Sequence, residues 1–240
     1  MSILAVERLD VRHGLLQAVR DVSFSVAKGE IVALVGANGA GKTTLLRALA
    51  GAHVPAGGSI RFNDRDVTRV PSHRRSAMGI ALVPEGRRLF AQMTVDENLL
   101  LARAAGRTGA WTLEAVIAAF PNLEKRRKAR AGTLSGGEQQ ATAIGRALMT
   151  NPELLLLDEV SLGLSPLAVD RVYASLATLM SSGTTIILVE QDLSRALKVA
   201  DRVMCMLEGR IVLAGRARDL AREQITDAYF GLSRGRGSAA

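Results

Sequence analysis

The segment GANGAGKT, residues 36–43, constrains the fold of this chain more than any other stretch. It follows the apolar run Ile31–Val35 and precedes residues 44–50, whose apolar spacing is helical. The sequence therefore predicts a strand, a glycine-rich loop and a helix in succession. Glycine at positions 36, 39 and 41 lets the backbone wrap closely around a ligand with its N–H groups pointing inward. The spacing GxxxxGK[ST] indicates a loop that binds the phosphates of a nucleoside triphosphate.

The residue types in this loop suit particular parts of a triphosphate. Lys42 can reach the β- and γ-phosphates, and the Thr43 hydroxyl can bind Mg²⁺. The N-terminus of the following helix adds partial positive charge. A plain glycine-rich turn is the alternative, and the Lys-Thr pair argues against it. The expected nucleotide contacts in this segment are Gly36, Ala37, Asn38, Gly39, Ala40, Gly41, Lys42, Thr43 and Thr44.

Length and composition are those of an α/β protein. The 240 residues are 48% hydrophobic and only 3% aromatic, and many apolar residues form short runs suited to buried parallel strands. We expect a cytoplasmic protein, because no apolar run is long enough to span a bilayer and no secretory signal pattern opens the chain. Cys205 is expected in a buried strand, and the three histidines form no metal cluster. The net charge of +8 is compatible with nucleotides, nucleic acid or anionic membranes.

Two further segments carry groups with possible chemical roles. In Leu134–Gln140, LSGGEQQ, a serine and two glycines precede a helical pattern, so the Ser135 hydroxyl and the helix N–H groups can hold an anion. A plain helix start is the alternative. The run Glu153–Glu159 indicates a buried strand that ends in two carboxylates. Asp158 is suited to hold Mg²⁺ through water and Glu159 to polarise an attacking water, with a surface cap as the alternative.

The rest of the chain supplies a coarse pattern of elements. Thr94 to Glu97 match a capping box that starts a mostly helical region ending near Arg130. A hairpin is expected around Glu208-Gly209-Arg210 and a helix over 193–199. Further strands are predicted at 2–6, 22–26, 59–62, 79–83 and 184–189.

These motifs, in this order, resemble the ATP-binding cassette family. GANGAGKT matches its Walker A motif, LSGGEQQ its signature, and LLLLDE its Walker B motif with the catalytic glutamate. The strings VPEGRRLF, MTVDENL, IGRALM, SLGLSP and LVEQ are similar to one subgroup, the ATPases of branched-chain amino-acid importers, of the LivF type. The resemblance implies an α/β P-loop NTPase cassette with a RecA-like parallel-sheet core, an antiparallel β edge and a helical subdomain.

The resemblance also implies how one ATP-binding domain covers residues 1–240. A catalytic core lobe would comprise 1–93 and 131–232. The helical signature subdomain would start at 94–130 and extend into the helix at 134–150, and 233–240 would be a flexible tail.

The resemblance assigns roles to the site residues and adds several to those already named. ATP and Mg²⁺ would lie between two subunits, with Lys42, Glu159 and Gln191 catalytic. Gln191 stands where a switch histidine is usual, and an amide can hydrogen-bond the γ-phosphate without taking its proton. His13 stands where a tyrosine usually stacks on adenine, with a solvated loop histidine as the alternative. The metal would be held by Thr43, Asp158 and Glu85, the last replacing a usual glutamine, and the nucleotide of the partner subunit would contact Ser135, Gly136, Gly137 and Glu138.

The partners implied are those of a transporter subunit. We expect a dimer with itself or a paralogous ATPase, two transmembrane permease subunits, an indirect contact with an extracytoplasmic solute-binding protein, and no nucleic acid. The protein would lie peripherally at the cytoplasmic face of the inner (plasma) membrane of a prokaryotic-type cell. Leu89 and Phe90 fit a permease-docking surface or, alternatively, a locally buried loop anchor.

The implied function is ATP hydrolysis that energises import of branched-chain amino acids. Urea, amides or other small solutes are alternatives. A soluble cassette ATPase acting on nucleic acid or ribosomes is a different class, which usually has two cassettes or a long coiled coil. This chain has one Walker A motif and no sustained heptads between Lys42 and Ser135. A GTPase is disfavoured because no NKxD-like motif is present.

Overall fold

The structure is a computed structural model that describes residues 2–181 and 183–232, and the chain forms two compact units. One unit combines Met1–Val70 with Ile187–Ala240, and the other is Pro71–Ile186. Strand β8 (Thr185–Val189) crosses the boundary between them. The tail predicted at 233–240 lies outside the described residues.

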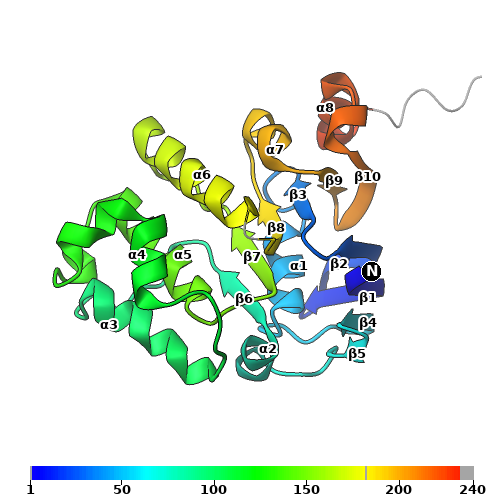
Figure 1. The fold of residues 1–240 in the computed structure, drawn as a ribbon. Helices are drawn as coiled ribbons and strands as arrows, with labels where there is room; N and C mark the ends of the chain where they lie inside the picture. The colour runs from blue at the N-terminus through cyan, green and yellow to red at the C-terminus, as the bar shows by residue number, and fades with distance from the viewer. Residues whose placement is uncertain (1, 182, 233–240) are drawn as a thin grey trace, which may run out of the picture. The chain divides into compact units, whose positions relative to one another are not determined.

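The first unit contains an antiparallel sheet with strand order β2-β1-β4-β5. Its strands are β1 (Ser2–His13), β2 (Leu16–Ala27), β4 (Gly57–Phe62) and β5 (Arg65–Asp66), seen in Figure 1. The strands predicted at 2–6 and 22–26 are confirmed, but both are longer than predicted. The β1–β2 register shifts between Val6 and Leu9, where Arg8 has a φ of 44°. A bulge re-aims the side chains that follow it, so the alternation in the sequence ends while the strand continues.

A group of parallel and antiparallel strands in the same unit carries the glycine-rich loop. β3 (Ile31–Val35) is buried throughout and pairs in parallel with β9 (Arg202–Leu207), which pairs antiparallel with β10 (Arg210–Arg216). The predicted strand at 31–35 and the predicted hairpin are confirmed. The helices of this unit are α1 (Lys42–Leu49), α7 (Leu193–Val199), the short η4 (Ala217–Asp219) and α8 (Arg222–Phe230). Ala196 of α7 and Ile225 of α8 share one buried cluster with β3 and β9, which fixes the strand that leads into the loop.

The second unit pairs β6 (Ile80–Val83) in parallel with β7 (Leu154–Asp158). Its α-helices are α2 (Ser72–Met78), α3 (Val95–Leu100), α4 (Leu113–Ala119), α5 (Gly136–Leu148) and α6 (Pro166–Ser181), and its short 3-10 helices are η1 (Leu101–Ala105), η2 (Pro121–Arg126) and η3 (Ala131–Thr133). The predicted helical region and its capping box are confirmed, since the Thr94 hydroxyl accepts a hydrogen bond from the Glu97 N–H at 3.2 Å. The sequence patterns above do not predict α2, α6 or α8.

Helix α5 packs closely against α3 and α4, the green group in Figure 1. Gly145 permits this approach, because a Cβ there would lie 2.7 Å from Val116 Cγ1 and 3.0 Å from Leu99 Cδ2. Phe120 and Leu123 are buried nearby in sequence, at the end of α4 and in η2. Helix α5 is therefore packed closely against the helical region near its C-terminal end.

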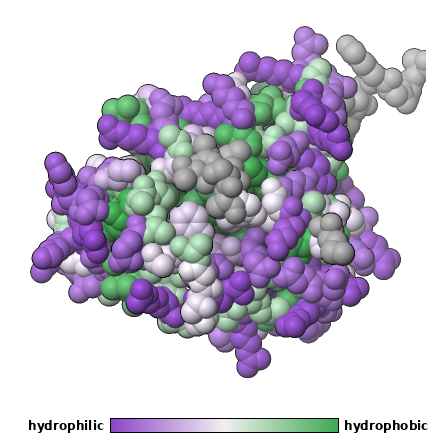
Figure 2. All heavy atoms as spheres, viewed as in Figure 1, coloured by the Kyte–Doolittle hydropathy of each residue, from purple (hydrophilic) through white to green (hydrophobic). Residues whose placement is uncertain are grey.

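Hydrophilic residues predominate on the face shown in Figure 2, with hydrophobic residues in small groups between them. Of the large apolar side chains, Leu15 at the β1–β2 turn and Phe90 after β6 are exposed at 101% and 56%. Within the described ranges, no helix combines the length and the apolarity needed to cross a membrane.

Cys205 should be inert toward thiol reagents in the folded protein. It is buried in β9, as predicted, and burial raises the pKa of its thiol to about 11, although Lys42 acts to lower it. Roughly one thiol in a thousand is then ionised at pH 8, and only the thiolate reacts. We expect no reaction with Ellman's reagent at pH 8 in native buffer and one reactive thiol per chain in denaturant. Ser72→Cys, on exposed α2, should react at once, and equally fast reaction of the native wild-type chain would contradict this assignment.

Candidate functional site

Residues 36–41 form a tight loop between β3 and α1. Gly36, Gly39 and Gly41 have φ values of 151°, 81° and 102°, which side chains rarely tolerate. Helix α1 begins at Lys42 with Gly41 as its N-cap, and no described side chain caps it. The first N–H groups of a helix lack intrahelical partners, and the helix dipole adds partial positive charge there. This end of α1 therefore suits an anion.

Neighbouring backbone fixes the loop from outside. A Cβ at Gly36 would lie 2.3 Å from the Met206 carbonyl oxygen, and one at Gly41 would lie 2.3 Å from that of Ala18. The Gly209 N–H also donates to the Ala40 carbonyl at 3.0 Å. The loop is thus shaped by contacts with β2 and with the β9–β10 hairpin.

Lys42 lies inside this loop with only 4% of its surface exposed. Its ammonium donates to the carbonyl oxygens of Gly36 at 2.6 Å and Ala37 at 3.0 Å. Hydrogen bonds between two charged groups are stronger than bonds to neutral carbonyls. A phosphate entering the loop would therefore compete well for this ammonium, and the residues present fit a triphosphate.

His13 ends β1 and is exposed. Its Nε2 lies 3.1 Å from the Thr44 hydroxyl, so the structure brings together two residues expected to contact a nucleotide. His53, in the loop after α1, packs against His13 with ring centroids 4.5 Å apart. Our sequence interpretation missed His53, because no motif or periodicity connects it with His13.

Glu85 and Asp158 lie at one edge of the β6–β7 pair, since Val83 pairs with Leu157 in parallel register. Asp158 is buried and Glu85 is exposed. Glu159 has a φ of 49°, a left-handed conformation that is uncommon outside glycine and often found at functional sites.

The acidic groups at this edge do not by themselves form a metal site. No cluster of three or more His, Cys, Asp or Glu side chains suited to a metal occurs in the described part of the chain. Mg²⁺ usually binds one or two carboxylates together with phosphate oxygens and water. Asp158 and Glu85 fit that partial role, whereas the third predicted ligand, Thr43, is the second residue of α1 in the first unit.

Gln191 follows β8, and hydrogen bonds hold the residues on both sides of it. The buried Glu190 carboxylate accepts hydrogen bonds from the N–H groups of Gln191 at 3.1 Å and Asp192 at 3.2 Å. Asp192 in turn caps α7 by accepting from the N–H groups of Ser194 and Arg195. The backbone that carries the Gln191 amide is therefore well defined.

The signature segment begins α5 with a complete capping box. The Glu138 carboxylate accepts hydrogen bonds from the Ser135 N–H at 2.8 Å and the Ser135 hydroxyl at 2.9 Å, and it pairs with Arg126 at 3.0 Å. Burial acts to raise the pKa of Glu138, but these hydrogen bonds outweigh it and lower the pKa. The Ser135 hydroxyl would have to turn away from Glu138 before it could donate to another anion.

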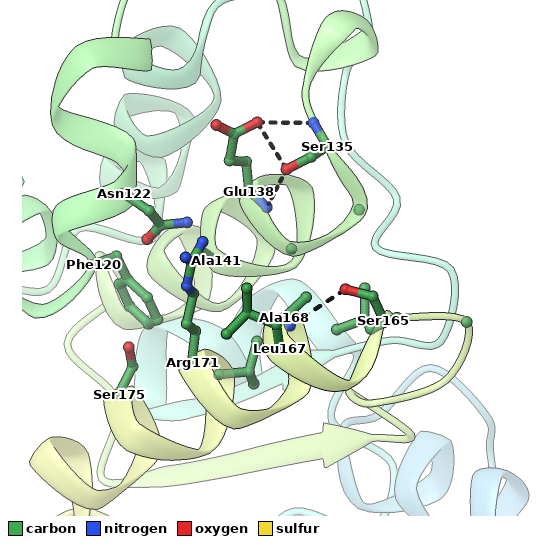
Figure 3. Close-up of a pocket in the computed structure, with 15 residues that line it drawn as sticks. Phe120, Asn122, Ser135, Glu138, Ala141, Ser165, Leu167, Ala168, Arg171 and Ser175 are labelled. Carbon is green, nitrogen blue, oxygen red and sulfur yellow. Dashed lines mark hydrogen bonds between the residues drawn. The ribbon is translucent and has the colours of Figure 1, made fainter.

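A cavity of about 390 Å³ opens beside this capping box (Figure 3). Its walls come from the first turn of α5, from the segment Phe120 to Asn122, and from α6 with the loop before it. Figure 3 shows Arg171 extending from α6 toward Asn122 and Ala141. The signature residues thus line an open space in the second unit, with Ser135 exposed and Gly137 close to Ala168 of α6.

The loop after β6 is held in an unusual conformation by α5. Gly86, Arg87 and Arg88 have successive φ values of 75°, 64° and 50°. The Arg146 guanidinium donates to the carbonyl oxygens of Arg87 at 3.2 Å and Arg88 at 2.8 Å, and it lies 5.9 Å from the centroid of the Phe90 ring. Its pKa is lowered by burial, so its charge lies in a partly desolvated place where these bonds are strong.

Hydrogen bonds fix the backbone of Phe90 within this loop. The buried Asn98 amide accepts a hydrogen bond from the Phe90 N–H at 2.9 Å and donates to the Phe90 carbonyl at 3.1 Å. The Phe90 side chain is nevertheless exposed, whereas Leu89 is half-buried. The Phe90 ring is therefore not a buried loop anchor. Our sequence interpretation did not identify Asn98 or Arg146, whose partners lie far away in the chain or on the backbone.

Comparison with known proteins finds both a family and close relatives. A family model described as "ABC transporter" matches residues 19–161. The chain is 45% identical over 238 residues to the high-affinity branched-chain amino acid transport ATP-binding protein BraG of Pseudomonas aeruginosa, covering 95% of this chain and 100% of that protein. It is 34% identical over 232 residues to the probable branched-chain amino acid transport ATP-binding protein LivF of Archaeoglobus fulgidus, covering 92% and 95%.

A solved structure shares the fold. The ADP conformation of MJ1267, an ATP-binding cassette of an ABC transporter, matches with a TM-score of 0.81 and 27% identity over 96% of this chain and 99% of that one. The predicted α/β cassette fold and the predicted family resemblance are confirmed.

Substitution of two glycines in the loop distinguishes the energetic cost of backbone strain from the cost of a steric clash. Gly39 and Gly41 both have left-handed φ values, but only at Gly41 would a Cβ meet a carbonyl oxygen, whereas nothing lies within 4 Å at Gly39. Gly39→Ala should lower the free energy of unfolding by about 1–2 kcal/mol through backbone strain. Gly41→Ala should cost about 1–3 kcal/mol more through overpacking. Urea unfolding without nucleotide measures both, and equal losses would contradict the steric role of the Ala18 carbonyl.

Proposed function

This chain belongs to the ABC transporter family, and from that premise we propose that it is the ATPase subunit of an importer for branched-chain amino acids. One observation carries the choice of solute, namely 45% identity to BraG over the whole of that protein. ATP hydrolysis coupled to transport is the activity of the family. The glycine-rich loop with its buried lysine is the part of this chain that suits the nucleotide.

Nucleotide binding would begin with an exchange of partners at Lys42. Its ammonium leaves the carbonyl oxygens of Gly36 and Ala37 for the β- and γ-phosphates. The N–H groups from Gly36 to Thr44 surround the phosphates, and the His13 ring stacks on the adenine base. Because the loop is already braced by backbone contacts, little ordering has to accompany binding.

Hydrolysis needs a metal and an oriented water. Mg²⁺, when bound with the nucleotide, would neutralise phosphate charge, and Thr43, Asp158 and Glu85 are the residues that would hold it. Glu159 polarises the attacking water, and it stands directly after β7 with a left-handed backbone conformation. Gln191 donates its amide N–H to the γ-phosphate and, lacking a titratable group, orients the phosphate without moving a proton.

A second ATPase subunit would complete the site. The phosphates of the partner's nucleotide would lie against Ser135, Gly136, Gly137 and Glu138 at the N-terminus of α5. The Ser135 hydroxyl exchanges the Glu138 carboxylate for a phosphate oxygen, and Arg126 keeps Glu138 paired when it does so. The partner is a second copy or a paralogous ATPase.

The remaining partners would be two permease subunits at the cytoplasmic face of the membrane, with an extracytoplasmic solute-binding protein beyond them. Phe90 is the candidate anchor for a permease, because it is an aromatic side chain exposed on a loop whose backbone is fixed by Asn98 and Arg146. Aromatic anchors on rigid supports are typical of energetically dominant interface residues.

Reconstitution of the complex in liposomes tests this function. Binding protein loaded with leucine, isoleucine or valine should stimulate ATP hydrolysis, whereas urea or an amide should not. Glu159→Gln should retain ATP binding and lower turnover by about 10²- to 10⁴-fold, as expected for loss of a general base. Phosphate release and equilibrium nucleotide binding measure the two effects.

Two variants serve as controls for that experiment. Glu223→Gln removes an exposed carboxylate on α8 and should leave turnover unchanged. Lys42→Ala should weaken ATP binding itself, roughly 10- to 100-fold, because it removes a charge-assisted hydrogen bond to phosphate. Wild-type turnover by Glu159→Gln would exclude its role, and stimulation by urea but not by leucine would exclude the proposed solute.

The docking role of Phe90 is tested by the double variant Leu89→Ser, Phe90→Ser. If the pair anchors a permease, its association with the permease subunits should weaken roughly 30-fold, equivalent to about 2 kcal/mol, while the isolated chain keeps its basal ATP hydrolysis. Val212→Ser, an apolar residue exposed on β10, is the matched control. Coupled leucine uptake at the wild-type rate by the double variant would contradict the docking role.

A further inference from the structure

Two histidines from separate segments of the first unit form a ring pair. His13 ends β1, and His53 lies in the loop that follows α1. Their ring centroids are 4.5 Å apart with an angle of 65° between the planes. An edge-to-face arrangement at this distance is the favourable geometry for two aromatic rings.

The His53 ring is anchored on its far side. Its Nε2 lies 2.8 Å from the Arg12 carbonyl oxygen, and because a carbonyl only accepts, Nε2 carries the hydrogen. The backbone N–H of His53 also donates to the carbonyl oxygen of Arg47, in the last turn of α1. His53 is thus fixed both to the strand that carries His13 and to the helix that starts at the phosphate loop.

The His13 ring is held by edge contacts and remains exposed. Its Nε2 meets the Thr44 hydroxyl at 3.1 Å, directly after the Lys42-Thr43 pair. Leu16 pairs with His13 across the β1–β2 ladder, so the two side chains share one face of the sheet, and Leu16 is 64% exposed. An imidazole and an apolar side chain therefore stand together beside the helix that would carry the phosphates.

We infer that His53 is a positioning residue for base recognition, which holds the His13 ring in the orientation that stacks on adenine. An imidazole has a smaller face than the phenol it replaces, so its orientation matters more. Without support, the exposed His13 side chain would lose conformational entropy when the nucleotide binds. The contact with His53 orders the ring before binding and so removes that cost. This inference rests on the proposed function, because it requires that the phosphate loop binds ATP.

Calorimetric titration of the purified chain with ATP and with inorganic triphosphate tests the inference. His53→Ala should weaken ATP binding about two- to tenfold, the effect of one side chain that must be ordered. Its affinity for inorganic triphosphate, which has no base, should be unchanged. His53→Phe keeps a ring at the same place and should restore ATP affinity toward the wild-type value.

Two further variants decide whether His53 acts through His13. His13→Ala should weaken ATP binding at least as much as His53→Ala does. The double variant His13→Ala, His53→Ala should bind ATP no more weakly than His13→Ala alone, because His53 would act only through His13. His73→Ala, on exposed α2, is the matched control and should bind both ligands normally.

Several outcomes would overturn the inference. These are unchanged ATP affinity of His53→Ala, an equal loss of triphosphate affinity, or additive losses in the double variant. A wild-type chain that binds neither ATP nor inorganic triphosphate would instead refute the proposed function, so the two failures are distinguishable.

Discussion

The first unit depends on the approach of two backbone carbonyls to glycines of the phosphate loop. The Met206 carbonyl meets Gly36 and the Ala18 carbonyl meets Gly41 at distances that leave no room for a side chain. Those carbonyls belong to β9 and β2, from opposite ends of the sequence. The loop can therefore keep its shape only when β2 and β9 are in place, and its left-handed residues are stabilised by tertiary structure and not by local propensity.

The same constraint explains how the loop tolerates a buried lysine. Burying an ammonium is costly unless it is hydrogen-bonded. The braced loop turns the carbonyls of Gly36 and Ala37 toward Lys42, which satisfies the charge at short range. The charge of Lys42 is thus hydrogen-bonded within the loop, and a phosphate bound there would replace two neutral acceptors with charged ones.

The sequence predicted those features whose cause is local. Continuous apolar runs identified β3, β7 and β8, because buried parallel strands need no alternation. The capping box of Thr94 and Glu97 and the helix start at Ser135 were recognisable, since Thr94-Glu97 and Ser135-Glu138 bond within one turn. Helix α8 was missed because, of its nine residues, only Ile225 and Ala228 are buried, too few for a visible apolar stripe. The lengths of β1 and β2 were missed because bulges reset the alternation.

Most site residues were likewise predictable from motifs, whereas the residues that position them were not. Lys42, Asp158 and Glu159 stand at fixed spacings from strand ends, and such spacings are visible in a sequence. His53 and Arg146 act through partners that are distant in the sequence, and their residue types are unremarkable. Only the three-dimensional structure shows that a second imidazole supports His13 and that an arginine binds the carbonyls of the loop before Phe90.

Helix α5 joins two surfaces of the second unit, namely the signature segment and the loop that carries Phe90. Its first residues form the signature segment, while Gln139 and Arg146 hold the loop that presents Phe90. Gly145 packs the same helix against α3 and α4 without a gap, so bending between the two surfaces would disrupt close contacts. Any displacement of Ser135 would either break the Ser135-Glu138 capping box or move α5 as a body. In the second case the loop at Arg87 and Arg88 would move with it, because Arg146 of α5 holds that loop, and the first turn of α5 would then be linked to the exposed Phe90 ring.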